Sequence, residues 1–231
     1  MESAIRGWLA AGTLGVALLA LPASALGANI GLLPHKRCYR AGEHVLLGGT
    51  GFTANTPAEV TLDRKSLGFA AADGQGMFRG LLSLGAVRGE RNRLLAVTDQ
   101  ANVSNYGALT LRATDVAVSV RPRRAGPGLA VRFKARGFTD SKRLYAHIRR
   151  GRRYRRNVGI GRLKGACRKV SRKKRIFSLG TRPGVYTVQF DGKRRYSKKT
   201  RPRILYRVTI FRRLVHRGSV SAAAASWVRL P

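Results

Sequence analysis

Acidic residues are scarce in this chain of 231 residues, which contains 10 Asp and Glu against 46 Lys and Arg. The scarcity is uneven along the chain. Residues 26–115 hold seven acids and ten bases, whereas residues 116–231 hold only Asp140 and Asp191 against 35 bases. Most of the formal net charge of +36 therefore belongs to the second half. With so few carboxylates, that half is almost excluded from catalysis by paired acids.

Histidine and cysteine are also few, with four and two residues. The histidines are scattered, and His35-x-x-Cys38 is the nearest approach to a metal-ligand spacing. His147 falls on the outward side of an alternating strand, where a solvated or stacked ring is expected. The chain has no Gly-x-Ser-x-Gly elbow and no phosphate-cradling glycine loop with lysine. We therefore expect no catalytic residues, no metal site, no cofactor and no enzyme activity.

Long apolar runs are absent after residue 21. The run Trp8–Leu21 follows Arg6 and precedes Ala23-Ser24-Ala25, which is the arrangement of a cleaved export signal over residues 1–25. About 14 apolar residues fall short of the roughly 20 that a membrane helix needs, although retention as an uncleaved anchor stays open. We predict a mature chain without a transmembrane span, secreted or associated with the cell envelope, outside the cytoplasmic membrane.

The two cysteines, Cys38 and Cys167, stand one in each half of the chain. Export permits a disulfide, and closing so long a loop would contribute about 4–5 kcal/mol in the chain-entropy model. Sequence alone does not place the two Cα atoms within bonding distance. An interdomain disulfide and two buried thiols therefore both remain open.

A strand pattern with a glycine turn occurs twice. In Leu129–Thr139 the apolar residues alternate with Arg132, Lys134 and Arg136, as in a half-buried strand that ends in Gly137-Phe138-Thr139. The same figure stands 86 positions earlier and ends in Gly51-Phe52-Thr53. We predict positive φ at both glycines, with the following phenylalanines turned into the core.

The repeat predicts an all-β chain of two tandem antiparallel immunoglobulin-like β-sandwiches, because each half approaches the roughly 100 residues of such a domain. Within the second domain, Asp191-Gly192 signals a tight type I′ hairpin. The expected order is a signal peptide over 1–25, domain 1 over 26–114, a strongly basic domain 2 over 115–213, and a loose C-terminal tail over 214–231.

The first domain contains three motifs of turn and core residues: Val45-x5-Gly51-Phe52-Thr53-x-Asn55, Val60-Thr61-Leu62-Asp63 with Gly68, and Asp73-x2-Gly76-x-Phe78. Together they resemble exported bacterial immunoglobulin-like repeats. Domain 2 keeps only the Gly-Phe-Thr turn. The resemblance implies a fold and an exported setting, and it transfers no functional residue.

The concentrated positive charge favours binding to a polyanion. The leading hypothesis is an exported non-enzymatic module that holds anionic envelope polymers or lipid headgroups through domain 2. Sequence-independent nucleic-acid binding outside the cell and a structural or adhesive spacer with a merely solvated basic surface are the alternatives. Oligomeric state stays open. The candidate binding residues are Arg132, Lys134, Arg136, Arg149, Arg152, Arg153, Arg155, Arg156, Lys173, Lys174, Lys193 and Arg194.

Overall fold

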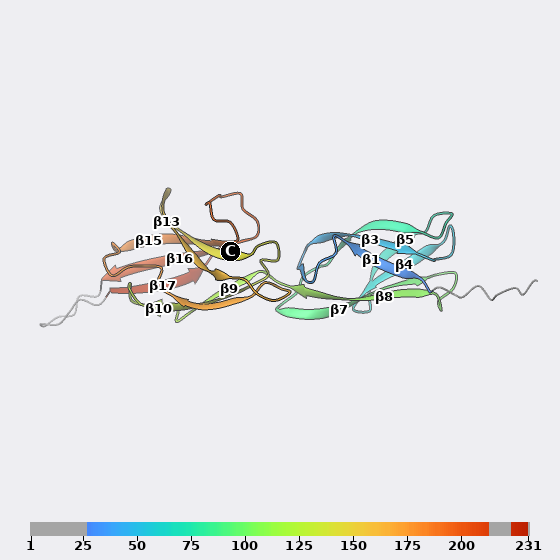
Figure 1. The fold of residues 1–231 in the computed structure, drawn as a ribbon, viewed down its shortest axis with the longest axis horizontal. Coiled ribbons are helices and arrows are strands. Elements are labelled where there is room, and N and C mark those ends of the chain that lie inside the picture. The colour runs from blue at the N-terminus through green and yellow to red at the C-terminus, as the bar shows by residue number, and fades with distance from the viewer. Residues whose placement is uncertain (1–26, 213–222, 231) are drawn as a thin grey trace, which may run out of the picture.

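The computed structural model describes residues 27–212 and 223–230, so the predicted signal peptide lies outside it (Figure 1). The described residues contain no helix long and apolar enough to cross a membrane. Within them the strands are, in chain order, β1 (Asn29–Leu33), β2 (Tyr39–Arg40), β3 (His44–Thr50), β4 (Pro57–Leu62), β5 (Lys65–Ala71), β6 (Phe78–Ser83), β7 (Glu90–Asp99), β8 (Tyr106–Thr114), β9 (Ala117–Arg121), β10 (Arg124–Ala125), β11 (Val131–Arg136), β12 (Arg143–Arg150), β13 (Arg153–Arg162), β14 (Val170–Lys174), β15 (Gly184–Asp191), β16 (Arg203–Arg212) and β17 (Ala223–Arg229).

Strands β1 to β8 form the first sandwich. One sheet has the order β1-β3-β6 and the other β2-β8-β7-β4-β5, and every pairing is antiparallel except the short β2–β8 pair. Alternate residues of both sheets point inward, because successive side chains of a strand face opposite ways. They build a core that includes Val45, Leu47, Phe78, Leu95 and Leu111.

Strands β9 to β17 form the second sandwich, with sheets of order β14-β11-β9 and β10-β17-β16-β15-β12-β13. All of their pairings are antiparallel. Phe133 of one sheet meets Phe190 and Trp227 of the other, with ring centroids 5.5 and 5.8 Å apart. The predicted fold class of two tandem antiparallel β-sandwiches is confirmed.

The repeated glycine turn is also confirmed. Gly51 and Gly137 both have a φ of 82°, a region that favours glycine because it has no Cβ. Phe52 and Phe138, which follow them, are buried in the cores of their own sandwiches. The same glycine turn therefore ends an equivalent strand in each sandwich, β3 in the first and β11 in the second.

The loose tail predicted over 214–231 is wrong for residues 223–229, which form β17 and pair with β16. Ala225 and Trp227 point into the core, whereas Ser226 and Val228 alternate with them on the other side. The alanine run hides this alternation in the sequence, because a small side chain fits either face. The second core therefore extends beyond residue 213.

The tight hairpin predicted at Asp191-Gly192 is wrong as well. Strand β15 ends at Asp191 and β16 begins at Arg203, with Asp191 and Arg203 paired across the sheet. Eleven residues, 192–202, connect them. The Asp191 carboxylate is buried and accepts hydrogen bonds from other groups, so it organises a longer loop.

The run Arg152–Arg156, whose basic composition is typical of an exposed loop, lies mostly in a strand. A turn with Gly151 at a φ of 56° leads into β13, which pairs with β12 along its length. β13 forms the outer edge of its sheet. An edge strand tolerates charged side chains on both sides, which removes the alternation by which strands are recognised.

The two sandwiches lie end to end, and several contacts join them (Figure 1). Only Asp115 and Val116 separate β8 from β9. A disulfide links Cys38 to Cys167 with their Cα atoms 5.1 Å apart, and both residues are buried. Of the two alternatives that the sequence left open, the structure has the interdomain disulfide. Because disulfides persist in oxidising compartments, this bond indicates a location outside the cytoplasm.

Ion pairs surround the same junction. The Nζ of Lys36 lies 3.1 Å from Oδ1 of Asp140, and an Arg40 nitrogen lies 3.3 Å from Oδ2 of the same carboxylate. On another side, Nζ of Lys169 lies 2.6 Å from Oε2 of Glu90. These pairs cross between the sandwiches in both directions, so acids from each half neutralise bases from the other.

Candidate polyanion-binding surfaces

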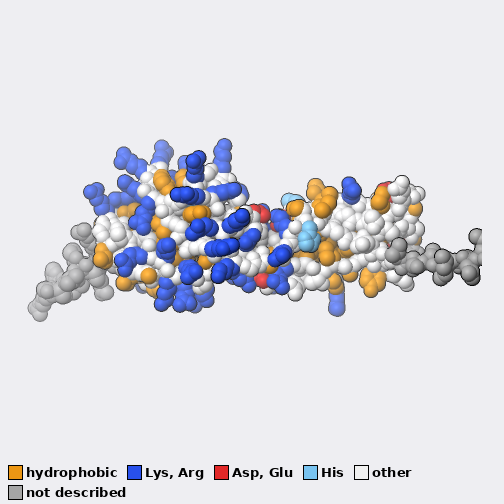
Figure 2. Space-filling view, in the orientation of Figure 1, with side chains coloured by type: hydrophobic (Ala, Val, Ile, Leu, Met, Phe, Trp, Pro, Cys, Tyr) orange, Lys and Arg blue, Asp and Glu red, His pale blue; other side chains and the backbone are white. Residues whose placement is uncertain are grey.

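Lys and Arg side chains gather over the second sandwich, whereas the first carries few of them (Figure 2). The strand register resolves part of this charge into an ordered array on the outer side of β14-β11-β9. We call this surface the three-stranded face. Its outward positions are Ala117, Ser119 and Arg121 on β9, Arg132, Lys134 and Arg136 on β11, and Lys169, Ser171 and Lys173 in and just before β14.

Residues directly opposite in an antiparallel sheet share a face, so these positions form rows across the strands. Arg132 stands between Arg121 and Lys173, and Lys134 stands between Ser119 and Ser171. Neighbouring strands lie about 4.8 Å apart, and alternate residues along a strand about 6.8 Å. Three cations in one row and a lysine between two hydroxyls in the next therefore occupy a small area.

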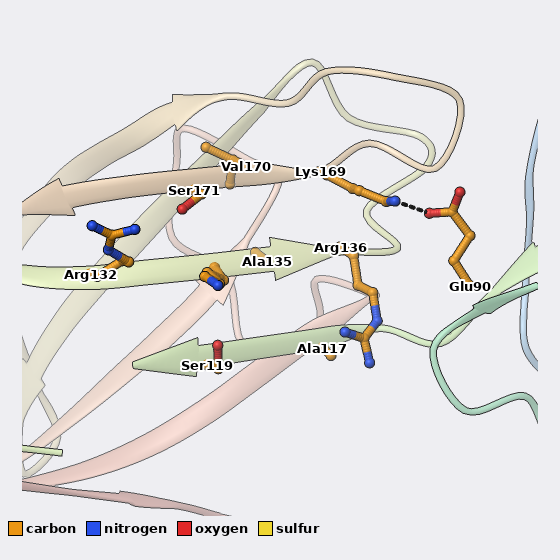
Figure 3. A pocket seen from close by; sticks show the side chains of 10 residues that line it. Glu90, Ala117, Ser119, Arg132, Ala135, Arg136, Lys169, Val170 and Ser171 are labelled. Atoms are coloured by element: carbon orange, nitrogen blue, oxygen red, sulfur yellow. Dashed lines mark ion pairs between the residues drawn. The ribbon is translucent and has the colours of Figure 1, made fainter. Parts of the chain in front are cut away.

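Carboxylates neutralise one end of the three-stranded face. Arg136 donates two hydrogen bonds to Asp115, of 2.6 and 3.0 Å. Burial pushes the pKa of Asp115 upward, but the hydrogen bonds and charge of Arg136 outweigh it and hold the pKa below its usual value. Lys169 pairs with Glu90 in the same region (Figure 3).

The remaining cations of the three-stranded face have no such partner. Within the described part of the chain, no carboxylate lies within ion-pair distance of Arg121, Arg132, Lys134 or Lys173. All four side chains are exposed. An open hollow of about 580 Å³ lies over the face, and its lining includes Ser119, Arg132 and Ser171 together with Glu90 and Arg136 of the neutralised end (Figure 3). The four exposed cations without a described carboxylate partner can receive anionic groups.

The second basic surface is the connection 192–202, which we call the basic loop. It lies over the outer side of β12, β13 and β15, and side chains of those strands hold its backbone. His147 Nε2 lies 3.0 Å from the carbonyl oxygen of Lys193, and Gln189 donates to the carbonyl of Ser197 at 2.8 Å. Asn157 donates to the carbonyl of Arg194. Three strands thus contribute one anchor each.

Asp191 organises these anchors from beneath the loop. Its carboxylate accepts from His147 at 3.1 Å, from Gln189 at 2.6 Å and from the backbone N–H of Lys193 at 2.8 Å. Because the Lys193 carbonyl only accepts, His147 carries a proton on Nε2. The His147, Gln189 and Asp191 side chains are all buried. The polar cluster fixes the loop backbone and leaves its cations outside.

The cations of the basic loop point into solvent, and an aromatic pair lies beside them. Tyr154 of β13 stacks on Tyr196 of the loop, with centroids 5.6 Å apart and an interplanar angle of 22°. The Arg149 guanidinium lies 5.3 Å from the Tyr196 ring centroid. Tyr154 remains 45% exposed, so one aromatic surface is accessible. The exposed cations of the loop are Lys193, Arg194, Arg195, Lys198, Lys199 and Arg201.

The structure divides the candidate residues predicted from sequence into separate groups. Arg132, Lys134, Arg136 and Lys173 belong to the three-stranded face. Lys174 is on the opposite side of β14 from Lys173, because the two are successive residues of one strand.

The other candidates lie on or beside the six-stranded sheet. Lys193, Arg194 and Arg149 lie at the basic loop, and Arg152 and Arg153 stand at the β12–β13 turn. Arg155 and Arg156 line a different hollow of about 380 Å³ at the sandwich edge. The sequence predicted one basic surface, whereas the structure has at least two.

Several surface residues were missed in the sequence. Arg121 and Ser119 follow the alternation of β9, so the sequence indicates that they face outward. It does not indicate which residues of β11 lie beside them, because that depends on strand pairing. Lys169 and Ser171 lay within a basic run in which no strand was recognised. His147 was expected to be solvated or stacked, but it is fully buried and meets the Tyr196 ring edge-on, with centroids 5.7 Å apart and an interplanar angle of 60°. Its role under the loop depends on residues more than forty positions away.

Within the described residues, no group of three His, Cys, Asp or Glu side chains could hold a metal ion. The side chains of the polar cluster under the basic loop instead form hydrogen bonds with one another and with the loop backbone.

Comparison with known proteins gave structural matches only. No family model and no curated protein matches the chain. Trypsin-activated alpha-2-macroglobulin from Escherichia coli matches 87% of this chain with 14% identity and a TM-score of 0.29. Salmonella alpha-2-macroglobulin reacted with methylamine matches 88% with 14% identity and a TM-score of 0.28. The chain covers 19% and 18% of the length of these proteins.

Proposed function

We propose that this protein is an exported, non-enzymatic β-sandwich module that binds anionic cell-envelope polymers or lipid headgroups through its second sandwich. The observation that supports this most is the array of unpaired cations on the three-stranded face. Arg121, Arg132, Lys134 and Lys173 share one surface, and no described carboxylate pairs with them.

Such an array repels itself, and bound anions relieve the repulsion. Cations about 5 to 7 Å apart on a sheet are within the Debye length of about 8 Å at physiological ionic strength. A ligand that binds only the folded protein stabilises it by mass action. The protein therefore gains stability when a polymer of closely spaced negative charges lies over the face.

The disulfide favours envelope anions over cytoplasmic nucleic acid, because it indicates an oxidising compartment. The first sandwich has little excess charge and joins the second through the disulfide and the ion pairs, so we assign it a supporting role.

Sequence-independent binding of single-stranded nucleic acid outside the cell is the second candidate. The Tyr154–Tyr196 stack favours it, because exposed aromatic rings beside cations stack bases without sequence preference. Envelope polymers without aromatic groups would use the cations alone. Replacement of Tyr154 with leucine separates these cases, since it would weaken only a stacked ligand.

The test measures retention of the full exported chain on anionic envelope fractions, duplex DNA and single-stranded DNA over a salt series. Log affinity for duplex DNA falls with log salt by about 0.9 for each phosphate contact. Changing Arg121, Arg132, Lys134 and Lys173 to glutamine should therefore flatten that slope by up to about 3.6. Envelope polymers should show the same direction, with a slope set by their own charge spacing.

A matched control removes the same number of exposed cations from the first sandwich, at Arg64, Lys65, Arg79 and Arg88. The control should bind as the unmodified protein does. Equal losses in both variants, or binding that salt does not weaken, would show that the three-stranded face is not the site. The protein would then be a spacer with a solvated basic surface.

A further inference from the structure

The two basic surfaces lie on opposite sides of one sandwich. The three-stranded face is the outer side of β14-β11-β9, and the basic loop covers the outer side of β12, β13 and β15. The inner sides of the two sheets meet in a single core, where Phe133 contacts Phe190. Because stacked sheets lie about 10 Å apart, the two basic surfaces face away from each other across the thickness of the domain.

Each surface is built independently of the other. The cations of the three-stranded face are placed by strand register, with Lys134 between Ser119 and Ser171. The cations of the basic loop are placed by hydrogen bonds from His147 and Gln189 to the loop backbone. No residue belongs to both surfaces, so a change in one leaves the other intact.

We infer that the second sandwich is bivalent and cross-links polyanions, holding one chain on each side. This inference rests on the proposed function. A stiff anionic chain cannot follow both surfaces, because it would have to reverse its direction around an edge of the sandwich. Duplex DNA has a persistence length of about 50 nm, far larger than the domain. Two chains, one on each side, satisfy both surfaces without bending.

Cross-linking adds a property that binding alone does not supply. A protein held by one polymer presents its second surface to neighbouring polymers at a high effective concentration. Polyanion molecules that each bind several copies of the protein are therefore cross-linked into a network. Anionic envelope polymers would be brought together by this protein, and their mutual repulsion would be offset by the bases between them.

The test is a capture assay with two 20-bp DNA duplexes, used as stiff polyanions of known charge spacing. One duplex is immobilised, the full exported chain is bound to it, and a second, fluorescent duplex is added after washing. The unmodified protein should capture the second duplex. Two variants each remove one surface, with glutamine at Arg121, Arg132, Lys134 and Lys173, or at Lys193, Arg194, Arg195, Lys198 and Lys199.

Each single-surface variant should still bind the immobilised duplex but should lose at least about nine-tenths of the captured fluorescence. The first-sandwich control at Arg64, Lys65, Arg79 and Arg88 should capture as the unmodified protein does. All replaced side chains are exposed, and melting temperatures no lower than that of the unmodified protein check that the variants are folded.

The outcomes separate the two proposals. If the unmodified protein binds the first duplex and captures no second one, the bivalent model is wrong and the proposed binding function stands. Full capture by both single-surface variants would also overturn it, because capture would then come from association between copies of the protein. Failure to bind even the first duplex at low salt contradicts both proposals.

Discussion

Gly51 and Gly137 have the same φ of 82° at equivalent places in the two sandwiches, but Gly137 lies where the two domains meet. A Cβ at Gly137 would approach the carbonyl oxygen of Asp115 to 2.2 Å. Asp115 is one of the two residues between β8 and β9 and also the partner of Arg136. The absence of a side chain at residue 137 therefore lets the domain linker pass close to the turn.

We expect Gly137→Ala to destabilise the second sandwich by more than about 2 kcal/mol. A non-glycine residue in this φ region costs about 1–3 kcal/mol, and the clash with Asp115 adds to it. Thermal or denaturant unfolding measures the change. Gly180→Ala is the control, since a Cβ there meets nothing within 4 Å, and it should change stability by less than about 0.5 kcal/mol. Equal midpoints for the two variants would show that the turn is not constrained.

Asp99 is a buried acid of the first sandwich whose role is structural. Burial by itself raises the pKa of Asp99, but hydrogen bonds from Thr53, Ala101 and Asn105 outweigh it and hold the pKa at about 2. The backbone N–H groups of Thr53 and Ala101 donate at 2.7 and 2.9 Å. The carboxylate therefore ties the Gly-Phe-Thr turn to the loop after β7.

This depressed pKa sets the direction of a pH effect. An unfolded aspartate has a pKa of about 3.9, so the contribution of Asp99 is complete above that pH and is lost as the pH falls toward 2. We expect the unfolding free energy of Asp99→Asn to fall less steeply between about pH 4 and pH 2 than that of the unmodified protein. Urea unfolding at several pH values measures both curves. Parallel curves would contradict the prediction.

At the scale of elements, the basic loop depends on its anchors. We expect His147→Phe to keep the sandwich folded while loosening residues 192–202, because phenylalanine fills the space but donates no hydrogen bond to Lys193. Loss of a bond worth about 1 kcal/mol raises the open population roughly fivefold. Trypsin should then cleave the loop faster by a similar factor.

The matched control for this prediction is His44→Phe, which changes an exposed histidine of β3 in the first sandwich. Its cleavage pattern should equal that of the unmodified protein. If His147→Phe leaves the cleavage rate within the basic loop unchanged, the histidine does not hold the loop, and the remaining anchors from Gln189 and Asn157 are sufficient.

Strands differ in how well the sequence predicts them. β9 and β11 were predictable because buried apolar residues alternate with more exposed ones, which are bases on β11 and Ala117, Ser119 and Arg121 on β9. β13 is an edge strand with arginines on both sides, and β17 begins with small residues, so neither shows that alternation. The outward direction of the charged residues on the three-stranded face was predictable on β11 and for Arg121 of β9, but not for Lys173, because no strand was predicted over β14.

The conformation of the basic loop could not be predicted from the sequence. Asp191-Gly192 has the local composition of a tight turn, but Asp191 accepts hydrogen bonds from His147 and Gln189. These contacts depend on the register of β12 against β15, which no local pattern contains. The separation of the basic residues onto opposite sides likewise follows from which sheet each strand joins, and strand order is a property of the whole fold.

At the scale of the whole molecule, the disulfide holds the sandwiches together. We expect Cys38→Ser with Cys167→Ser to leave both cores folded, since each has its own buried residues, but to free the angle between them. In the chain-entropy model the lost cross-link is worth about 4–5 kcal/mol, because it closes a loop of more than 100 residues. Small-angle X-ray scattering should show a broader distribution of overall lengths.

Reductant supplies a second comparison for the same prediction. It should broaden the distribution for the unmodified protein and leave the serine variant unchanged. Identical scattering of oxidised, reduced and variant protein would mean that the ion pairs of Asp140 and Glu90 suffice to fix the angle. High salt would then be expected to release it, because exposed ion pairs are screened.

The paired connection at the junction has a mechanical consequence. Residues 115–116 and the Cys38–Cys167 bond run between the same two bodies, so a pull along the long axis is shared by two covalent paths. Two attachment points also resist twisting, which one peptide linker permits. Tension applied to the second sandwich would therefore reach the first through both connections, without rotation about a single peptide linker.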